Sequence, residues 1–241
     1  MEVHHHSHAG GKKWTHYLWE FLMLFLAVFC GFLAENQREH YTEKQREKKF
    51  ISRLLSDLNE DTAFYKKRIA DLERFQKKTD AFVNVMTGNI KPTDYQVLSA
   101  FVPMLYHYDV QVTTATYDQM KSSGSLRYIH DDEITDALQK YYEILIPRTL
   151  GKPAEAKAFF LQFTAPYVTK HFRTQDMIIN ADTLEKKSQV MLNRTPESDQ
   201  ELINLIVMYG DIQDKLIVLL KPAMKKAQEI IEMIKQEYHL K

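Results

Sequence analysis

A single carboxylate inside an apolar run is the feature of this sequence best suited to chemistry. Glu20 is the only charged residue between Trp14 and Ala34, and the 14 residues from Phe21 to Ala34 are all apolar or small. An ionisable side chain at membrane depth normally faces protein or water, which makes Glu20 a functional-site hypothesis. His16 stands one helical turn earlier, where it would be a local partner. The alternative is that Glu20 lies at the lipid headgroups and extends its carboxylate toward water.

The same run has one helical face that would let a second helix approach closely. Its members follow a 4-3 spacing and are Glu20, Leu24, Ala27, Gly31 and Ala34. Heptad spacing of this kind places residues on one side of a helix. Ala27 and Gly31 form a small-xxx-small pair, which is typical of helix packing in membranes. We therefore predict that this face packs against a second copy of the chain or another membrane protein.

Tyrosines gather in the middle of the chain. Seven of the 13 tyrosines fall between Tyr95 and Tyr142. Tyrosine combines an apolar ring with a polar tip, as binding surfaces favour. The tyrosines that would line a ligand pocket in this region are Tyr106, Tyr108, Tyr117, Tyr128, Tyr141 and Tyr142. The alternative is that these rings fill a helical core and keep their hydroxyls at its rim.

The remaining residues give little sign of a reaction. A histidine run in residues 1–13 offers weak metal-ligand candidates, which are His4, His5, His6 and His8. We expect this segment to be a disordered tail, without the second shell that fixes metal ligands. The sequence has no glycine-rich phosphate loop, H-E-x-x-H or G-x-S-x-G motif, and its one cysteine, Cys30, lies in the apolar run. These observations predict a non-enzymatic protein without a cofactor.

Composition narrows the class of protein further. The 32 basic and 32 acidic residues balance, so the chain lacks the basic excess of a nucleic-acid binder. Only seven glycines and seven prolines occur in 241 residues, and Lys, Glu, Gln, Leu and Ala are common. Few helix breakers and many helix formers favour long helices.

The apolar run predicts one transmembrane helix over residues 14–34. Its 21 residues match the roughly 20 needed to cross a hydrocarbon core. Trp14, Tyr17 and Trp19 cluster at one end, as in an aromatic belt at the bilayer surface. A cleaved signal peptide is an alternative, but no clear A-x-A cleavage site follows the run. A buried core helix of a soluble protein is the other alternative.

Beyond the span we predict an all-α domain over residues 35–241. The sequence has no Pro, and no Gly after Gly31, between the span and Gly88, so the helix should continue as a stalk over residues 35–87. Residues 93–241 should form a kinked helical bundle, in which Gly124 and Pro147 end helices and Thr195 caps the last one. The stalk carries a 4-3 seam for packing, formed by Ile51, Leu55, Leu58, Thr62, Tyr65, Ile69, Leu72, Gln76, Thr79, Val83 and Met86.

A stretch around Gly124 resembles a known family. A K-S-S-G-x-L element, Lys121 to Gly124 with Leu126, precedes a short helix that ends in the pair Tyr141-Tyr142. Together with Glu20 and Gly31 in the span, these residues resemble a family of uncharacterised bacterial single-span membrane proteins, which contain a domain of unknown function. The resemblance implies the helical fold and an anchor in the bacterial inner membrane, and it implies no activity.

Two charge signals predict opposite sides of the membrane for the domain. Six basic residues within 20 positions after Ala34 favour the cytoplasm, whereas Lys12-Lys13 before the run is typical of an uncleaved signal anchor. We favour a periplasmic domain, because large domains translocate largely regardless of charge.

Three functions are compatible with these patterns. The first is protein interaction or scaffolding by a homo-oligomer anchored in the lipid bilayer. The second is a ligand-sensing module with the tyrosine pocket. The third is energy coupling through Glu20, because a short tail, an early membrane carboxylate and an external helical domain resemble the plug-type subunits of proton-driven motors.

Overall fold

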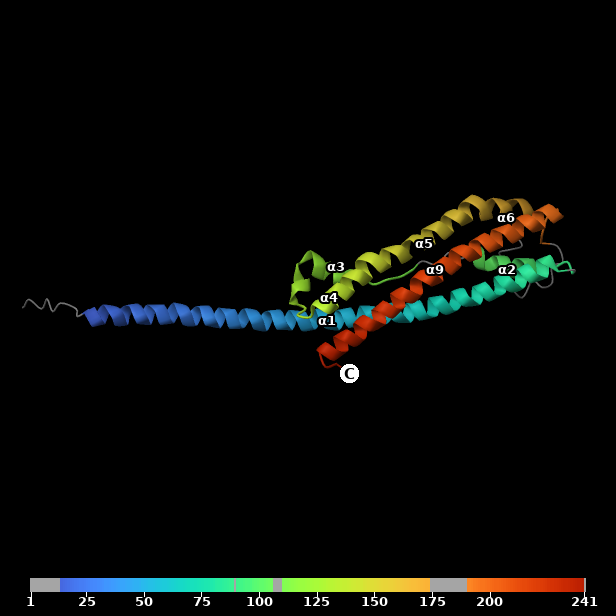
Figure 1. The fold of residues 1–241 in the computed structure, drawn as a ribbon. Coiled ribbons are helices and arrows are strands. Elements are labelled where there is room, and N and C mark those ends of the chain that lie inside the picture. Colours follow the sequence, from blue (N-terminus) through green and yellow to red (C-terminus); the bar gives the residue numbers. More distant parts are fainter. Residues whose placement is uncertain (1–13, 89, 106–109, 174–189, 241) are drawn as a thin grey trace, which may run out of the picture. The chain divides into compact units, whose positions relative to one another are not determined.

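The computed structural model of this protein describes residues 14–88, 90–105, 110–173 and 190–240. Over these ranges the chain is all-α, as the sequence predicted. The first helix, α1 (Trp14–Thr87), runs without interruption for 74 residues (Figure 1). The predicted continuity from the apolar run into the following segment is therefore confirmed. The chain divides into two compact units between Lys49 and Phe50, so α1 contributes to both.

The first unit contains the candidate membrane-spanning segment. Among the described residues, α1 is the one helix whose length and composition would allow it to cross a membrane. Its most apolar 18-residue window has a mean hydropathy of 2.0, and none of that window is buried. Phe21, Phe25 and Phe29 stack along one side, with ring centroids 6.3 Å and 5.9 Å apart.

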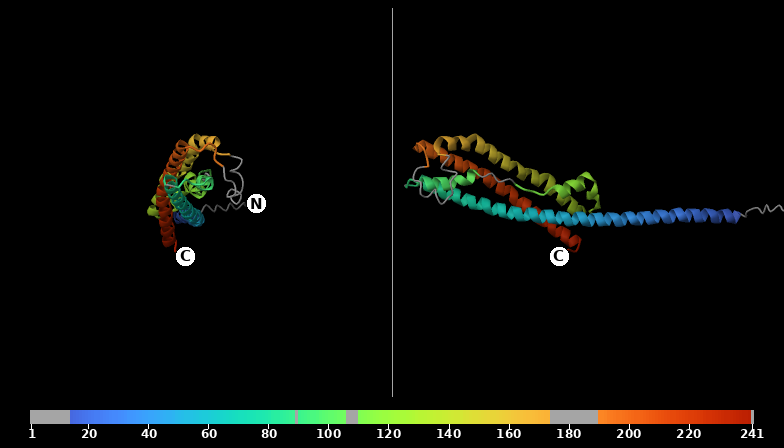
Figure 2. Two further views of the ribbon diagram at one scale, coloured as in Figure 1. Left: turned by 90° about the vertical axis from the view of Figure 1, so that its right-hand side faces the viewer. Right: turned by 180° about the vertical axis from the view of Figure 1, so that it is seen from behind.

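The second unit, residues 50–241, is a bundle built around the rest of α1 and one long C-terminal helix. That C-terminal helix is α9 (Pro196–Glu237). The other described elements of this unit are α2 (Asp94–Leu105), α3 (Ala115–Ser122), η1 (Ser125–Tyr128), α4 (Asp132–Gln139), η2 (Lys140–Leu145), α5 (Ile146–Phe159), η3 (Phe160–Thr164) and α6 (Ala165–His171). From α4 to α6 these elements follow one another without a break. Figure 2 shows this composite helix running beside α9.

Within this unit α1 and α9 pack in antiparallel directions. Lys221 of α9 pairs with Glu73, their Nζ and Oε1 atoms being 2.9 Å apart. Three residues later on α1, Gln76 donates to Asp214 at 3.3 Å. Residue numbers thus fall along α9 as they rise along α1. Gly210 completes the series, because a Cβ atom placed there would lie 3.6 Å from the methyl carbon of Thr79.

Two hydrophobic cores follow one another along this helix pair. The first joins α1 residues from Ile51 to Leu72 with the C-terminal half of α9 and with α3, α4 and η2. The second joins Phe82 with α2, α5, α6 and the N-terminal half of α9. The chain therefore buries apolar side chains in two separate clusters, and the polar side chains of Arg68 and Gln213 lie where the clusters meet.

The packed face of α1 differs in part from the predicted seam. Every seventh residue of that seam from Ile51 to Thr79 is buried, as predicted. Among the intervening predicted members Ile69 is also buried and Gln76 is exposed, while Leu54, Asp61, Arg68 and Phe82 are buried although the predicted seam left them out. The seam packs within the chain, so it is not available to a second copy.

Local sequence signals account for most of the helix ends. Thr195 caps α9 by accepting from the Ser198 amide at 3.2 Å, and the Ser198 hydroxyl accepts from the Thr195 amide at 2.9 Å. Gly124 follows α3 with φ +67°, a left-handed conformation that favours glycine. The expectation that Pro147 ends a helix is wrong, because α5 includes it in its first turn.

Candidate functional site

Two of the predicted pocket tyrosines lie in a widened helical turn. Tyr141 and Tyr142 belong to the π-helix η2, which ends two residues before Pro147. Proline has no amide hydrogen, and its ring crowds the carbonyl four residues earlier, so a local departure from α-helical hydrogen bonding relieves the clash. The second π-helix, η3, likewise ends two residues before Pro166. Such segments are frequent at functional sites, and here the widened turn buries two consecutive aromatic rings.

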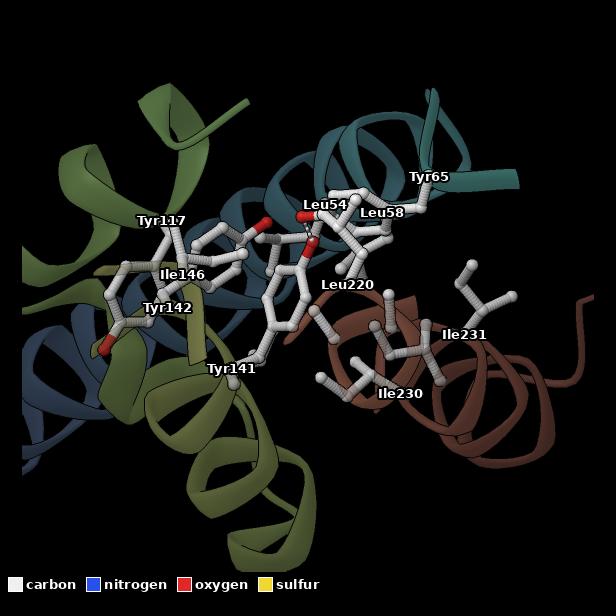
Figure 3. Packing of buried hydrophobic residues seen from close by; sticks show 14 of the residues in the cluster. Leu54, Leu58, Tyr65, Tyr117, Tyr141, Tyr142, Ile146, Leu220, Ile230 and Ile231 are labelled. Atoms are coloured by element: carbon white, nitrogen blue, oxygen red, sulfur yellow. Dashed lines mark hydrogen bonds between the residues drawn. The ribbon is translucent and has the colours of Figure 1, made fainter. Parts of the chain in front are cut away.

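Tyr141 joins a buried hydrogen-bond chain with two residues of α1. Its hydroxyl donates to Oδ2 of Asp61 at 2.7 Å and lies 2.9 Å from the hydroxyl of Tyr65. The backbone amide of Thr113 donates to Oδ1 of Asp61 at 2.9 Å. Asp61 is 2% exposed, so these donors replace the water that a carboxylate would otherwise bind. Figure 3 shows Tyr65 and Tyr141 meeting with their hydroxyls together inside the first core.

Burial sets the protonation states of the Asp61 carboxyl and of the Tyr65 and Tyr141 hydroxyls. Desolvation raises the pKa of the Asp61 carboxyl, and the hydrogen bonds from Thr113 and Tyr141 lower it in part. Desolvation also raises the pKa of the Tyr65 and Tyr141 phenols well above their usual range. Both phenols therefore remain protonated and act as hydrogen-bond donors rather than as bases.

The other rings of this region pack against one another. Tyr117 stacks on Tyr142 with centroids 4.5 Å apart, and Tyr142 meets Tyr141 edge-on at 4.7 Å. The Tyr117 hydroxyl donates to Glu143, which also pairs with Lys121 at 2.9 Å. All three tyrosines belong to the first hydrophobic core. Tyr128 is partly buried beneath the Arg127 guanidinium, and Tyr106 and Tyr108 lie outside the described residues.

A cavity lies at a different place, where the two cores meet. It has a volume of about 210 Å³ and opens between α1 and α9. Neither Tyr117, Tyr141 nor Tyr142 is among its lining residues, which are Arg68, Asp71, Leu72, Arg74, Phe75, Lys78, Tyr209 and Gln213. Arg68 and Gln213 also line a second, water-sized space of about 10 Å³ that reaches Lys152 of α5. The two residues thus form a buried polar layer between apolar clusters.

The predicted packing face of the first unit is open. All five of its residues, Glu20, Leu24, Ala27, Gly31 and Ala34, are exposed. His16 lies 3.1 Å from the Glu20 carboxylate, which is the partnership expected from their spacing. A Cβ atom placed on Gly31 would meet nothing within 4 Å. The metal candidates His4, His5, His6 and His8 lie outside the described residues.

Sequence reasoning missed the polar residues of the bundle interior. Asp61 and Arg68 are charged, so a search for apolar residues at heptad spacing does not include them. The signal was present nevertheless, because both stand in the seven-residue register of Leu54, Phe75 and Phe82. A charged residue in register with core positions indicates a buried polar group that has partners.

Comparison with protein-family models, with curated proteins and with solved structures gave no match. The resemblance to single-span bacterial membrane proteins therefore stays a prediction.

Proposed function

We propose that this protein is a non-enzymatic, single-span membrane protein that acts as a homo-oligomeric interaction scaffold. In this proposal residues 14–34 cross the bacterial inner membrane, and the face that contains Ala27 and Gly31 is the contact between copies. The bundle then presents its surface to protein partners.

The observation that carries the proposal is that the exposed apolar segment, residues 14–34, has phenylalanine rings on one side and small residues on the other. The Phe21, Phe25 and Phe29 rings stack along one side of α1. Helical spacing puts Ala27 and Gly31 on the opposite side, where nothing contacts a Cβ atom built on Gly31. Small residues on an apolar helix let backbones approach, which is how helices associate in lipid. The seam beginning at Ile51, by contrast, is occupied within the chain, so self-association rests on the span.

Crosslinking through Cys30 tests this proposal. The thiol is exposed, neighbours Gly31 and is the only cysteine of the chain. Treatment of native membranes with a short bis-maleimide should trap a dimer or a higher form of the full chain. Gly31→Leu should reduce the trapped fraction, because the added side chain keeps the backbones apart.

Leu22→Phe is the matched control for that variant. It also adds bulk to the apolar segment, but helical spacing places it on the side away from Gly31. Trapping should be unchanged in this variant. A chain that stays monomeric without substitutions, or an equal loss in both variants, would contradict the proposed face.

We also propose that the bundle lies on the periplasmic side. Support comes from Lys12-Lys13 directly before the apolar run and from the size of the domain that follows. Protease added to intact spheroplasts should then degrade residues 50–241. Protection of the bundle until the spheroplasts are lysed would place it in the cytoplasm instead.

A further inference from the structure

Two carboxyl groups lie one helical turn apart on the part of α1 that packs in the first core. Asp61 is 2% exposed, and Asp57 is partly buried. The Oδ2 atom of Asp57 is enclosed and has no hydrogen-bond partner among the described residues. The charges that act on Asp61 come from Asp57 and Glu60, which are both acidic. Like charges at this spacing repel each other, so a positive charge bound between them would be stabilised.

A third oxygen near this pair is also without a partner. The Tyr142 side chain is 6% exposed, and its hydroxyl makes no hydrogen bond within the part of the chain that the structure describes. Burial raises the pKa of this phenol, and the charges of Asp61 and Asp57 raise it further. The Tyr142 hydroxyl therefore points toward the two carboxylates, as does the hydroxyl of its neighbour Tyr141, which donates to Asp61 at 2.7 Å.

These oxygens form a ligand set for a small, hard cation. Asp57 offers its free Oδ2 atom, and Tyr142 offers its hydroxyl oxygen. Each Asp61 oxygen accepts one hydrogen bond, from Thr113 or Tyr141, and keeps a second acceptor position. Oxygen ligands suit Ca²⁺ and Mg²⁺, with water completing the coordination. Histidine and cysteine, which transition metals prefer, do not join acidic residues in any metal-binding group among the described residues.

We propose that Asp57, Asp61 and Tyr142 bind one divalent cation, Ca²⁺ or Mg²⁺. The two carboxylates bring two negative charges, which one such ion balances. Asp57 is the side of entry, because it is the partly exposed member of the set. The ion joins α1 to η2, which holds Tyr142, so its binding stabilises the first core. Affinity depends on the number of charged ligands, and two carboxylates give an expected dissociation constant of about 10⁻⁴–10⁻³ M.

Calorimetric titration of the full chain tests the proposal. The chain is held in nanodiscs of phosphatidylcholine, which carries no net charge, and is first freed of metal with a chelator. CaCl₂ and MgCl₂ are the probes, and NaCl at the same ionic strength is the control. At least one divalent probe should bind at one site per chain. At about 10 mM, the ion that binds should raise the melting temperature by roughly 3–10 °C, and NaCl should not.

Three variants assign the ligands. Asp57→Asn should weaken binding by about 10-fold or more, because a charged ligand is lost while the shape of the side chain is kept. Tyr142→Phe should weaken binding several-fold. It should not lower the melting temperature of the metal-free chain, since the hydroxyl has no protein partner to lose. Glu60→Gln is the matched control, because it removes an exposed carboxylate of α1 that acts on Asp61 only through its charge.

The outcomes separate the proposal from simpler explanations. Equal losses of affinity in Asp57→Asn and Glu60→Gln would indicate diffuse attraction to the acidic surface and would overturn the site. An equal rise in melting temperature with NaCl would do the same, because it would reflect general screening of charge. Full affinity in Tyr142→Phe would overturn the proposed ligand set. If neither divalent ion binds at about 10 mM, the proposal fails as a whole, and the free oxygens of Asp57 and Tyr142 bind water only.

Discussion

Replacing Tyr141 by phenylalanine should destabilise the bundle far more than the same change at Tyr65. The Tyr141 hydroxyl donates to the Asp61 carboxylate at 2.7 Å and lies 2.9 Å from the Tyr65 hydroxyl, so its loss breaks both contacts. A hydrogen bond to a charged group contributes about 1.5–3 kcal/mol and a neutral one about 0.5–1.5 kcal/mol. The expected cost of Tyr141→Phe is therefore about 2–4 kcal/mol. Tyr65→Phe removes only the neutral contact and should cost about 0.5–1.5 kcal/mol.

Thermal unfolding of the full chain measures this difference. For a bundle of this size, about 1 kcal/mol shifts the melting temperature by roughly 2–4 °C. Tyr141→Phe should therefore lower it by about 5–15 °C and Tyr65→Phe by about 1–6 °C. Near-ultraviolet circular dichroism of the 13 tyrosines is the suitable signal, because Trp14 and Trp19 both lie in the apolar segment.

The double variant provides the decisive comparison. In the presence of Tyr141→Phe, the buried Tyr65 hydroxyl has lost its partner, and an unsatisfied buried donor costs free energy. Adding Tyr65→Phe to that background should therefore be neutral or stabilising, although it is destabilising by itself. Equal, additive costs in both backgrounds would refute a hydrogen-bond chain, because independent sites add.

Three further predictions follow from other residues. Burial raises the pKa of Asp61 above its ordinary value of 3.8, so ionisation of this carboxyl destabilises the folded state. The free energy of unfolding should therefore fall as the pH rises from 3.8 through the raised pKa. Asp61→Asn should remove this fall, which melting temperatures from acid to neutral pH would show. Gly124→Ala should cost about 1–2 kcal/mol because of its φ of +67°, whereas Gly151→Ala, within α5, should stabilise by about 0.5–1 kcal/mol in the same denaturant titration. If the span serves assembly alone, Glu20→Gln should leave unchanged the growth of cells that depend on this protein. Loss of growth in this variant, with crosslinking through Cys30 intact, would instead favour energy coupling.

The outline of the fold was predictable because its signals are local. Absence of breakers made α1 continuous, a left-handed glycine ended α3 at Gly124, and Thr195 began α9 through hydrogen bonds within four residues. The effect of Pro147 was not predictable in the same way. A proline in a helix interior loses one backbone hydrogen bond and crowds the preceding turn, and here a π-helical turn directly before Pro147 accommodates the ring.

The interior polar residues depend on contacts that no local pattern encodes. Asp61 is stable in the core because Tyr141, 80 residues later, and Thr113, 52 residues later, both donate to it. Three of the tyrosines that were predicted to line a pocket, Tyr117, Tyr141 and Tyr142, instead belong to the first hydrophobic core, and Tyr141 donates to Asp61 from there.

Arg68, which lines the cavity between α1 and α9, illustrates the same limit. It stands seven residues after Asp61 on the same face of α1, but it lines a cavity, whereas Asp61 accepts a hydrogen bond from Tyr141 of the first core. The residues that face them differ, because Asp61 accepts from Thr113 and Tyr141, whereas Arg68 lines a small space with Gln213 of α9. In the first core α9 presents apolar side chains such as Leu220, whereas at Arg68 it presents the amide of Gln213. Two charged residues in one heptad register therefore have different surroundings, which are set by segments distant in the sequence and are given only by the folded structure.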